Sequence, residues 1–143
     1  MSYFQAMKKL SCYLPLAALL LFGSAGCSKS NDAMPAPAPA AVPQEYQVEY
    51  RVSSPTAPAA DYLAYNDDKG STTLGNTPLP VSYSFKRTMK RGDYLNVSAT
   101  TPAAPGGGPT TLLTIILLNG KEVKRTQATA ITPQAVTVYV IGE

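Results

Sequence analysis

From Glu45 to its last residues, the chain alternates apolar and polar side chains in short runs, and stretches containing proline or glycine separate these runs. Successive side chains of a β-strand point to opposite faces, so a two-residue period predicts strands with one buried face. The clearest run is residues 46–52, in which every second residue, beginning with Tyr46, is Tyr or Val. We find no window here with the 3.6-residue period of an amphipathic helix. The alternation therefore predicts an all-β domain.

Seven runs have this strand-like character. They cover residues 46–52, 61–66, 79–85, 94–99, 112–118, 121–127 and 136–141. We expect residues 71–78, which are polar, to be irregular, and residues 86–93 to form a charged bend. Seven short strands with proline- and glycine-rich connections predict an immunoglobulin-like antiparallel β-sandwich, with a small β-barrel as the alternative.

One hairpin is predicted in more detail. Asn119 and Gly120 are well suited to a two-residue type I′ turn, because both of its central residues need positive φ. The preceding run, residues 112–118, is the most apolar of the domain and is expected to be a central strand. The following run, residues 121–127, carries charges on both faces, which is how natural sheets protect an edge strand from unwanted pairing.

The first 26 residues have the order of a secretory signal peptide. Two lysines precede an apolar run at residues 10–22, and small residues follow it up to Cys27. As a helix, that run spans about 20 Å, whereas the hydrocarbon core of a bilayer measures about 30 Å. We therefore expect residues 1–26 to be removed by cleavage between Gly26 and Cys27, rather than kept as a membrane helix.

The four residues that end at Cys27, Ser-Ala-Gly-Cys, resemble the lipobox of bacterial lipoproteins. The resemblance implies that Cys27 carries a diacylglyceryl group and an amide-linked acyl chain such as palmitate, which together anchor a protein stably. The alternative is ordinary secretion with a free thiol. Ser28 stands where lipoproteins retained in the inner membrane of enteric bacteria have Asp, so we expect the outer membrane rather than the inner membrane of a bacterial envelope.

Residues 27–44 are predicted to be a tether between this anchor and the domain at residues 45–143. Its alternating Pro and Ala residues remove amide donors and favour extended backbone. At about 3.1 Å per residue, residues 28–44 reach on the order of 50 Å. A ligand for a proline-binding module is the alternative reading of this segment.

Composition excludes several classes of function. The 12 Lys and Arg residues nearly balance the 9 Asp and Glu residues, so we expect no nucleic-acid binding. Histidine, the commonest general base and metal ligand, is absent. We therefore expect no enzyme, no metal and no cofactor. Cys12 lies in the signal, so we also expect no internal disulfide in the mature chain.

Three groups of side chains are candidate binding residues. Lys86, Arg87, Lys90 and Arg91 place four positive charges within six residues, which suits anionic headgroups or an acidic glycan, although a solvated bend is the plainer interpretation. Acidic residues at 61, 67 and 68 suit a calcium ion or an ordinary turn. The tyrosines suit either a sugar-stacking platform or the core; they are Tyr46, Tyr50, Tyr62, Tyr65, Tyr83, Tyr94 and Tyr139.

The order of motifs resembles the periplasmic domain of the mycobacterial MmpS family. The resemblance is carried by residues 46–50, 60–70, 79–80 and 115–123. It implies a β-sandwich that serves as an accessory subunit of a lipid-exporting transporter. This chain lacks the cysteine pair of that family and has the lipid signal in place of a membrane helix. We expect a membrane-anchored, non-catalytic envelope lipoprotein that binds an envelope partner; the alternative is a cell-surface module for glycan or small-ligand binding or adhesion.

Overall fold

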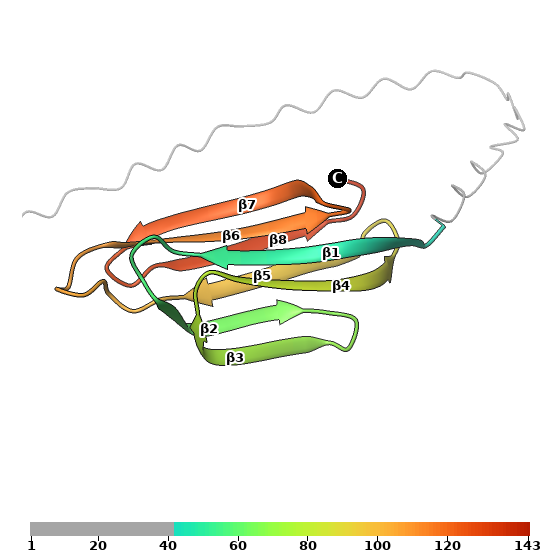
Figure 1. The fold of residues 1–143 in the computed structure, drawn as a ribbon. Coiled ribbons are helices and arrows are strands. Elements are labelled where there is room, and N and C mark those ends of the chain that lie inside the picture. Colours follow the sequence, from blue (N-terminus) through green and yellow to red (C-terminus); the bar gives the residue numbers. More distant parts are fainter. Residues whose placement is uncertain (1–41) are drawn as a thin grey trace, which may run out of the picture. The chain divides into compact units, whose positions relative to one another are not determined.

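The computed structural model describes residues 42–143, which form eight antiparallel strands in two packed four-stranded sheets (Figure 1). The strands are β1 (Gln44–Ser53), β2 (Ala59–Asn66), β3 (Ser71–Pro78), β4 (Val81–Met89), β5 (Tyr94–Thr100), β6 (Thr110–Leu118), β7 (Lys121–Ala130) and β8 (Gln134–Val140). The first sheet has the order β4-β1-β6-β7 and the second has the order β3-β2-β5-β8. The predicted all-β sandwich is confirmed. Cys27, the signal and most of the tether lie outside the described residues.

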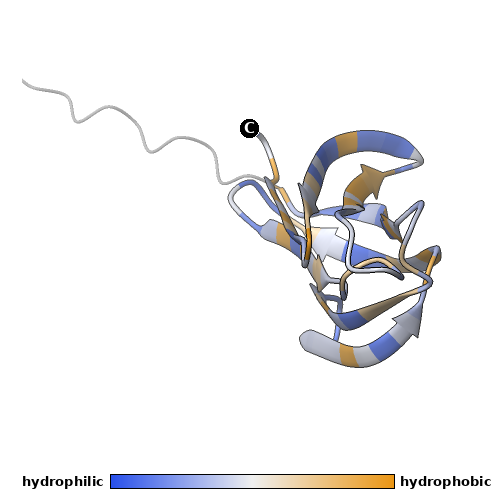
Figure 2. Ribbon diagram, turned by 90° about the vertical axis from the view of Figure 1, so that its left-hand side faces the viewer, coloured by the Kyte–Doolittle hydropathy of each residue, from blue (hydrophilic) through white to orange (hydrophobic). Residues whose placement is uncertain are grey.

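The core lies between the two sheets and follows the predicted alternation. Val48, Tyr50 and Val52 on β1 are fully buried, as are Leu95 and Val97 on β5. Hydrophilic and hydrophobic residues alternate along the strands in Figure 2. Because each buried apolar side chain contributes on the order of 2 kcal/mol, this layer accounts for the stability of a domain whose described residues contain no cysteine.

The expectation for residues 71–78 was wrong, because this segment is strand β3 and pairs with β2. Its inward positions are Thr72, Leu74 and Thr77, so only one of them is strongly apolar. Asn76 has a φ of 46°, which interrupts the extended backbone and shifts the inward positions from even to odd numbers. Both effects hide the two-residue period.

The predicted bend at residues 86–93 was also wrong in its first half. Strand β4 continues to Met89, whose side chain is buried in the core. Arg87 occupies an inward-facing position of this strand, which breaks the apolar pattern in the sequence. The turn itself comprises Lys90 to Asp93, where Asp93 Oδ2 accepts a hydrogen bond from the main-chain N–H of Lys90 at 2.9 Å.

The predicted hairpin is confirmed. Asn119 and Gly120 have φ angles of 51° and 79°, as a type I′ turn requires. The side chain of Asn119 also accepts a hydrogen bond from the main-chain N–H of Gln47 at 2.9 Å, and this contact ties the turn to β1. Strand β6 lies inside its sheet and β7 lies at the edge, as expected.

All eight strands run along one axis, so the connections collect at two ends (Figure 1). We call the end where the chain enters β1 the near end; it also holds the turns after β2, β4 and β6 and the C-terminus. The far end holds the connections after β1, β3, β5 and β7. Main-chain hydrogen bonds join connections at both ends, for example from Leu79 N to Pro58 O at 2.9 Å at the far end. Residues 42–143 include no helix of the length and apolarity needed to span a membrane.

Candidate functional site

The two ends of the sandwich differ in charge. The near-end turns carry Asp67, Asp68, Lys69 and the charged residues of positions 90–93. The far-end connections are residues 54–58, 79–80, 101–109 and 131–133, and none of them contains a charged residue. Each of these four connections contains at least one proline, which lowers the entropy that a loop loses when it is ordered by a partner. The four far-end connections therefore form an uncharged and partly preorganised surface.

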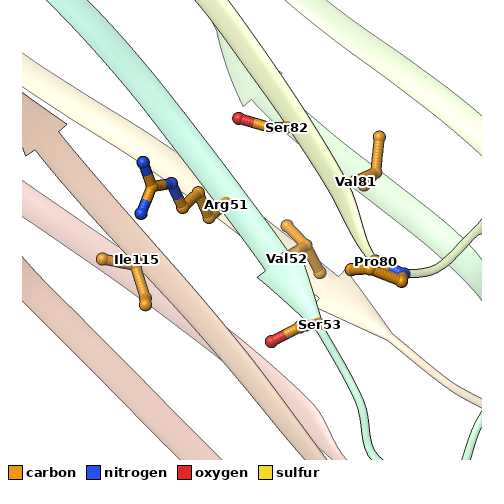
Figure 3. A pocket seen from close by; sticks show the side chains of 7 residues that line it. All are labelled: Arg51, Val52, Ser53, Pro80, Val81, Ser82 and Ile115. Carbon is orange, nitrogen blue, oxygen red and sulfur yellow. The ribbon is translucent and has the colours of Figure 1, made fainter.

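The far end includes an open hollow of about 280 Å³ on the outer side of the first sheet. The residues that line it belong to three neighbouring strands, β4, β1 and β6, and to the connection that precedes β4 (Figure 3). They are Arg51, Val52, Ser53, Pro80, Val81, Ser82 and Ile115. In β1 and β6 the register places Arg51 directly beside Ile115. The hollow therefore has apolar walls with one guanidinium group at its margin.

A charged network holds this guanidinium group in place. Arg51 Nε lies 2.7 Å from Glu49 Oε1, and Arg51 Nη2 lies 3.2 Å from Glu49 Oε2. The hydroxyl group of Ser82 donates to Glu49 Oε1 at 2.8 Å. The hydrogen bonds from Arg51 and Ser82 lower the pKa of Glu49 below its usual value, so the carboxylate stays charged. Arg51 keeps free N–H groups for a ligand, since 53% of its side chain is exposed.

The four candidate basic residues do not form one patch. Lys86 points to the outer face of β4 and pairs with Glu45, with Lys86 Nζ 3.1 Å from Glu45 Oε1. Arg87 points inward, and its buried Nη1 atom has no hydrogen-bond partner within residues 42–143. Lys90 and Arg91 are exposed in the near-end turn. Of the four, only Lys90 and Arg91 can contact the same anionic surface.

Most of the candidate tyrosines belong to the core. Tyr50, Tyr65 and Tyr83 pack together, with ring centroids 5.7 Å apart for the first two and 4.6 Å apart for the last two. Tyr46 and Tyr139 are half-buried against the same core. The interpretation of these five side chains as core material is confirmed.

Two tyrosines remain available as a platform. Tyr62 and Tyr94 are 42% and 57% exposed, on neighbouring strands β2 and β5 of the second sheet. In this sheet Tyr62 pairs with Thr100, six positions along β5 from Tyr94, which corresponds to about 20 Å. The two rings are therefore too far apart to stack on the same sugar ring, and they form two separate contact points on the outer face of the second sheet.

The acidic residues do not converge. Asp61 lies in the first half of β2, and Asp67 follows the other end of this strand. The carboxylate of Asp67 accepts hydrogen bonds from Lys69 N–H at 2.8 Å and Thr72 Oγ1 at 3.1 Å, which is the geometry of an ordinary turn. The hydrogen bond from the main-chain N–H of Lys69 is the main reason why the pKa of Asp67 is lowered. Among residues 42–143, no three acidic or cysteine side chains are grouped so that they could hold a metal ion.

The hollow was not predicted from the sequence. Its residues come from three separate runs, and only the register of β4, β1 and β6 brings Arg51, Pro80 and Ile115 together. Pro80 was placed within the predicted strand 79–85, whereas β4 begins at Val81, and the prediction gave no indication of a cavity. No protein-family model matches this chain, and no curated protein matches it in sequence.

Proposed function

We propose that this protein is a lipid-anchored module of a bacterial cell envelope that binds a partner through the far end of its β-sandwich and performs no catalysis. The anchor is the lipidated Cys27, which is inserted in the outer membrane rather than in the inner membrane. The partner is another envelope protein, and the resemblance to the MmpS family makes a component of a transporter complex the leading candidate. The observation that carries the proposal is the set of uncharged, proline-containing connections at the far end, together with the open hollow beside them.

The position of this surface supports the proposal. The chain enters the domain at Gln44, at the near end, so the far end is the end of the domain that lies farther from the point where the tether joins it. Arg51 at the margin of the hollow would pair with a carboxylate of the partner, while Ile115 and Pro80 would contact an apolar side chain. Few charges need to lose their water when such a surface is buried.

The anchor is tested by labelling growing cells with a clickable palmitate analogue. The full chain is expected to incorporate the label and to sediment with membranes, whereas the Cys27→Ser variant is expected to do neither. Mass spectrometry of the mature amino terminus should find Cys27 as the first residue, with a diacylglyceryl group on its sulfur atom and an acyl chain on its amino group. A mature protein that begins at another residue would contradict this part of the proposal.

The binding surface is tested by photo-crosslinking in the same cells. A photoreactive amino acid at Thr56 or Pro105, both exposed at the far end, should yield one reproducible adduct with an envelope protein. The near-end control positions, Lys69 and Lys121, are also exposed and should yield none. The same adduct from all four positions, or from the near end alone, would contradict far-end docking.

The second candidate function is binding of a neutral glycan or small ligand at the cell surface. The exposed rings of Tyr62 and Tyr94 favour it, because aromatic faces stack well on sugars. A glycan array probed with the full chain should then show binding that is lost in the Tyr62→Ala, Tyr94→Ala double variant and kept in Tyr46→Phe.

A further inference from the structure

The four edge strands of the sandwich differ in how far they are covered. Strands β7 and β8 lie against each other, and Thr126 Oγ1 on β7 donates a hydrogen bond to Val136 O on β8 at 3.0 Å. Strand β3 is interrupted by the left-handed Asn76 and ends at Pro78. Strand β4 is extended over nine residues without such an interruption. It pairs with β1 on one side, and no strand of residues 42–143 covers its other edge.

The hydrogen bonds of β1 show which main-chain groups of β4 face this open edge. On the side of β6, the N–H of Gln47 donates to Asn119 Oδ1 at 2.9 Å, and the C=O of Gln47 accepts from Asn119 N–H at 2.8 Å. Even-numbered residues of β1 therefore bond to β4, and the register pairs them with odd-numbered residues of β4. The main-chain groups of Ser84, Lys86 and the other even-numbered residues of β4 point to the open edge.

Half-buried aromatic side chains lie beside this edge. Tyr83 and Phe85 are the inward-facing residues at the centre of β4, and both are half-buried against the core. Tyr83 stacks on Tyr65 of β2 with ring centroids 4.6 Å apart, so large side chains fill the space between the sheets here. Strands β3 and β4 do not approach each other as β7 and β8 do. A strand added to β4 would therefore bury the exposed parts of Tyr83 and Phe85.

Arg87 is an unpaired cation at the same edge. Its side chain faces inward and is half-buried, and its buried Nη1 atom has no hydrogen-bond partner within residues 42–143. None of the ion pairs among these residues includes Arg87. Burial raises the pKa of Tyr50 and the charge of Arg87 opposes this rise, so the guanidinium group lies near the core. A guanidinium group that loses water without gaining a partner is costly, and an anion supplied at this edge would satisfy it.

We propose that β4 accepts an extended segment of another protein as a fifth strand of the first sheet, with an acidic residue of that segment paired to Arg87. Main-chain hydrogen bonds to the even-numbered residues of β4 hold the segment, and its inward-facing side chains cover Tyr83 and Phe85. Because Arg87 bonds to β1, it lies at a position of the new ladder where opposite side chains come closest. The edge runs along the side of the sandwich, so this site does not depend on what the far end binds.

Charge identifies a different protein, rather than a second copy of this chain, as the source of the segment. Edge strands β3, β4 and β8 contain no Asp or Glu. The one acidic residue of β7, Glu122, is paired with Arg125, with Arg125 Nε 3.0 Å from Glu122 Oε1. An edge strand of a second copy therefore brings no free carboxylate to Arg87. A lipid headgroup brings an anion but has no row of main-chain groups to pair with the edge.

The site predicts a sequence pattern for the segment. All strand pairs of this domain are antiparallel, and we expect the same of the added strand. The segment then has the order acidic-polar-apolar-polar-apolar. Its acidic residue lies opposite Arg87, and its two apolar residues lie opposite Phe85 and Tyr83. Its polar residues face the outer side of the sheet, as Lys86 and Ser84 do.

The test measures the binding of synthetic peptides to the full chain, purified from membranes in detergent, by fluorescence anisotropy. The probe is the peptide Thr-Glu-Thr-Val-Thr-Val-Thr, with fluorescein on its amino terminus and an amide at its carboxyl terminus. It is expected to bind with a Kd below ~1 mM. Replacing its Glu by Gln should weaken binding at least about tenfold, because Arg87 then has no charged partner. The same residues in reversed order should bind as weakly, because the Glu no longer meets Arg87 when the valines cover the aromatic side chains.

Two variants of the protein separate the role of Arg87 from a general effect of charge. Arg87→Met keeps a long apolar side chain and removes the charge, so it should bind the Glu peptide at least about tenfold more weakly than wild type does. Its Tm should be no lower than that of wild type, because the free chain gives this charge no partner. Lys86→Met is the matched control. It removes the neighbouring charge on the outer face and should change the Kd of the Glu peptide by less than about threefold.

Amide hydrogen exchange, measured by NMR on the full chain, tests the strand pairing directly. In the free chain, the N–H groups of Phe85 and Arg87 should exchange slowly because they bond to β1. Those of Ser84 and Lys86 should exchange fast. The Glu peptide should slow the exchange of Ser84 and Lys86 and leave that of Phe85 and Arg87 slow.

Several outcomes would overturn the proposal. Slow exchange at Ser84 and Lys86 in the free chain shows that another part of the chain or a second copy already covers the edge. Equal binding of the Glu and Gln peptides, or full binding by folded Arg87→Met, shows that Arg87 does not receive the acidic residue. No binding of the Glu peptide at ~1 mM protein shows that the edge does not accept a strand of this pattern. None of these measurements involves the far-end positions Thr56 and Pro105, so the two proposals fail separately.

Discussion

The hydroxyl oxygen of Tyr50 lies 2.8 Å from the main-chain carbonyl oxygen of Asn66 and also 2.8 Å from Asn66 Oδ1. Tyr50 belongs to β1 of the first sheet, and Asn66 is the last residue of β2 in the second. The same Asn66 accepts a hydrogen bond from Asn96 N–H at 2.7 Å and donates to the carbonyl oxygen of Tyr94 at 3.0 Å. One side chain therefore connects three strands near one end of the core.

Removing the hydroxyl group of Tyr50 should weaken the contact between the sheets. We expect Tyr50→Phe to lower the free energy of unfolding by about 1 kcal/mol, because a partly buried hydrogen bond is lost and the ring stays in place. The matched control is Tyr46→Phe, whose hydroxyl group donates only to exposed Gln44 Oε1 at 3.2 Å. Urea denaturation should find the control within about 0.5 kcal/mol of wild type. Equal losses in both variants would contradict the role assigned to Asn66.

The same tyrosine should make the domain sensitive to alkali. Burial raises the pKa of Tyr50 above its ordinary value of 10.0, so the neutral phenol is favoured in the folded state. This contribution to stability is complete below pH 10 and is lost as the pH rises from there toward the higher folded pKa. When thermal unfolding is measured from pH 8 to pH 12, the Tm should therefore decline less in Tyr50→Phe than in wild type. Tyr83, whose pKa burial also raises, accounts for part of the decline that remains.

A second polar contact joins the sheets through the middle of the core. The hydroxyl oxygens of Thr114 on β6 and Thr137 on β8 are buried and 2.6 Å apart, and Thr137 Oγ1 also lies 3.2 Å from the carbonyl oxygen of Thr114. Thr137→Val leaves the hydroxyl group of Thr114 buried without this partner, at a cost of about 1–3 kcal/mol. Replacing both threonines by valine should cost less than the two single changes added together. A strictly additive double-mutant cycle, measured by urea unfolding, would show that the two hydroxyl groups are not coupled.

The turn between β6 and β7 should depend on its glycine. Gly120 has a φ of 79°, which L-residues rarely adopt, although a Cβ atom there would meet no neighbouring atom within 4 Å. We expect Gly120→Ala to destabilise the domain by about 1 kcal/mol through backbone strain alone. Gly108→Ala is the control, since Gly108 also has open space around it but no positive φ. Differential scanning calorimetry should find a lower Tm for Gly120→Ala only.

The strands could be predicted wherever apolar side chains occupy the inward positions, as at Val48, Tyr50 and Val52. Prediction from the local pattern was not possible where another residue type occupies an inward position. Arg87 in β4 and the threonines of β3 are such cases, and the left-handed Asn76 also shifts the alternation. Pairing with a neighbouring strand determines which side chains face inward at these positions. The local sequence pattern carries no information about that pairing.

The candidate binding surface was less predictable than the fold for a related reason. The sequence does display uncharged, proline-rich segments such as residues 101–109. It does not indicate that these segments meet at the same end, or that Arg51 and Ile115 are register neighbours beside Pro80. Pairing between distant strands creates the surface, so composition reveals its chemistry but not its location.

Because all strands run along one axis, the length of the domain sets the affinity that the proposed partner binding would require. With Cys27 anchored as proposed, the tether and the ten residues of β1 place the far end within about 80 Å of the membrane. One molecule confined to a hemisphere of that radius has an effective concentration of about 1.5 mM. A membrane partner within this range would be mostly occupied even at a Kd of about 100 μM, so weak contacts at an uncharged surface suffice.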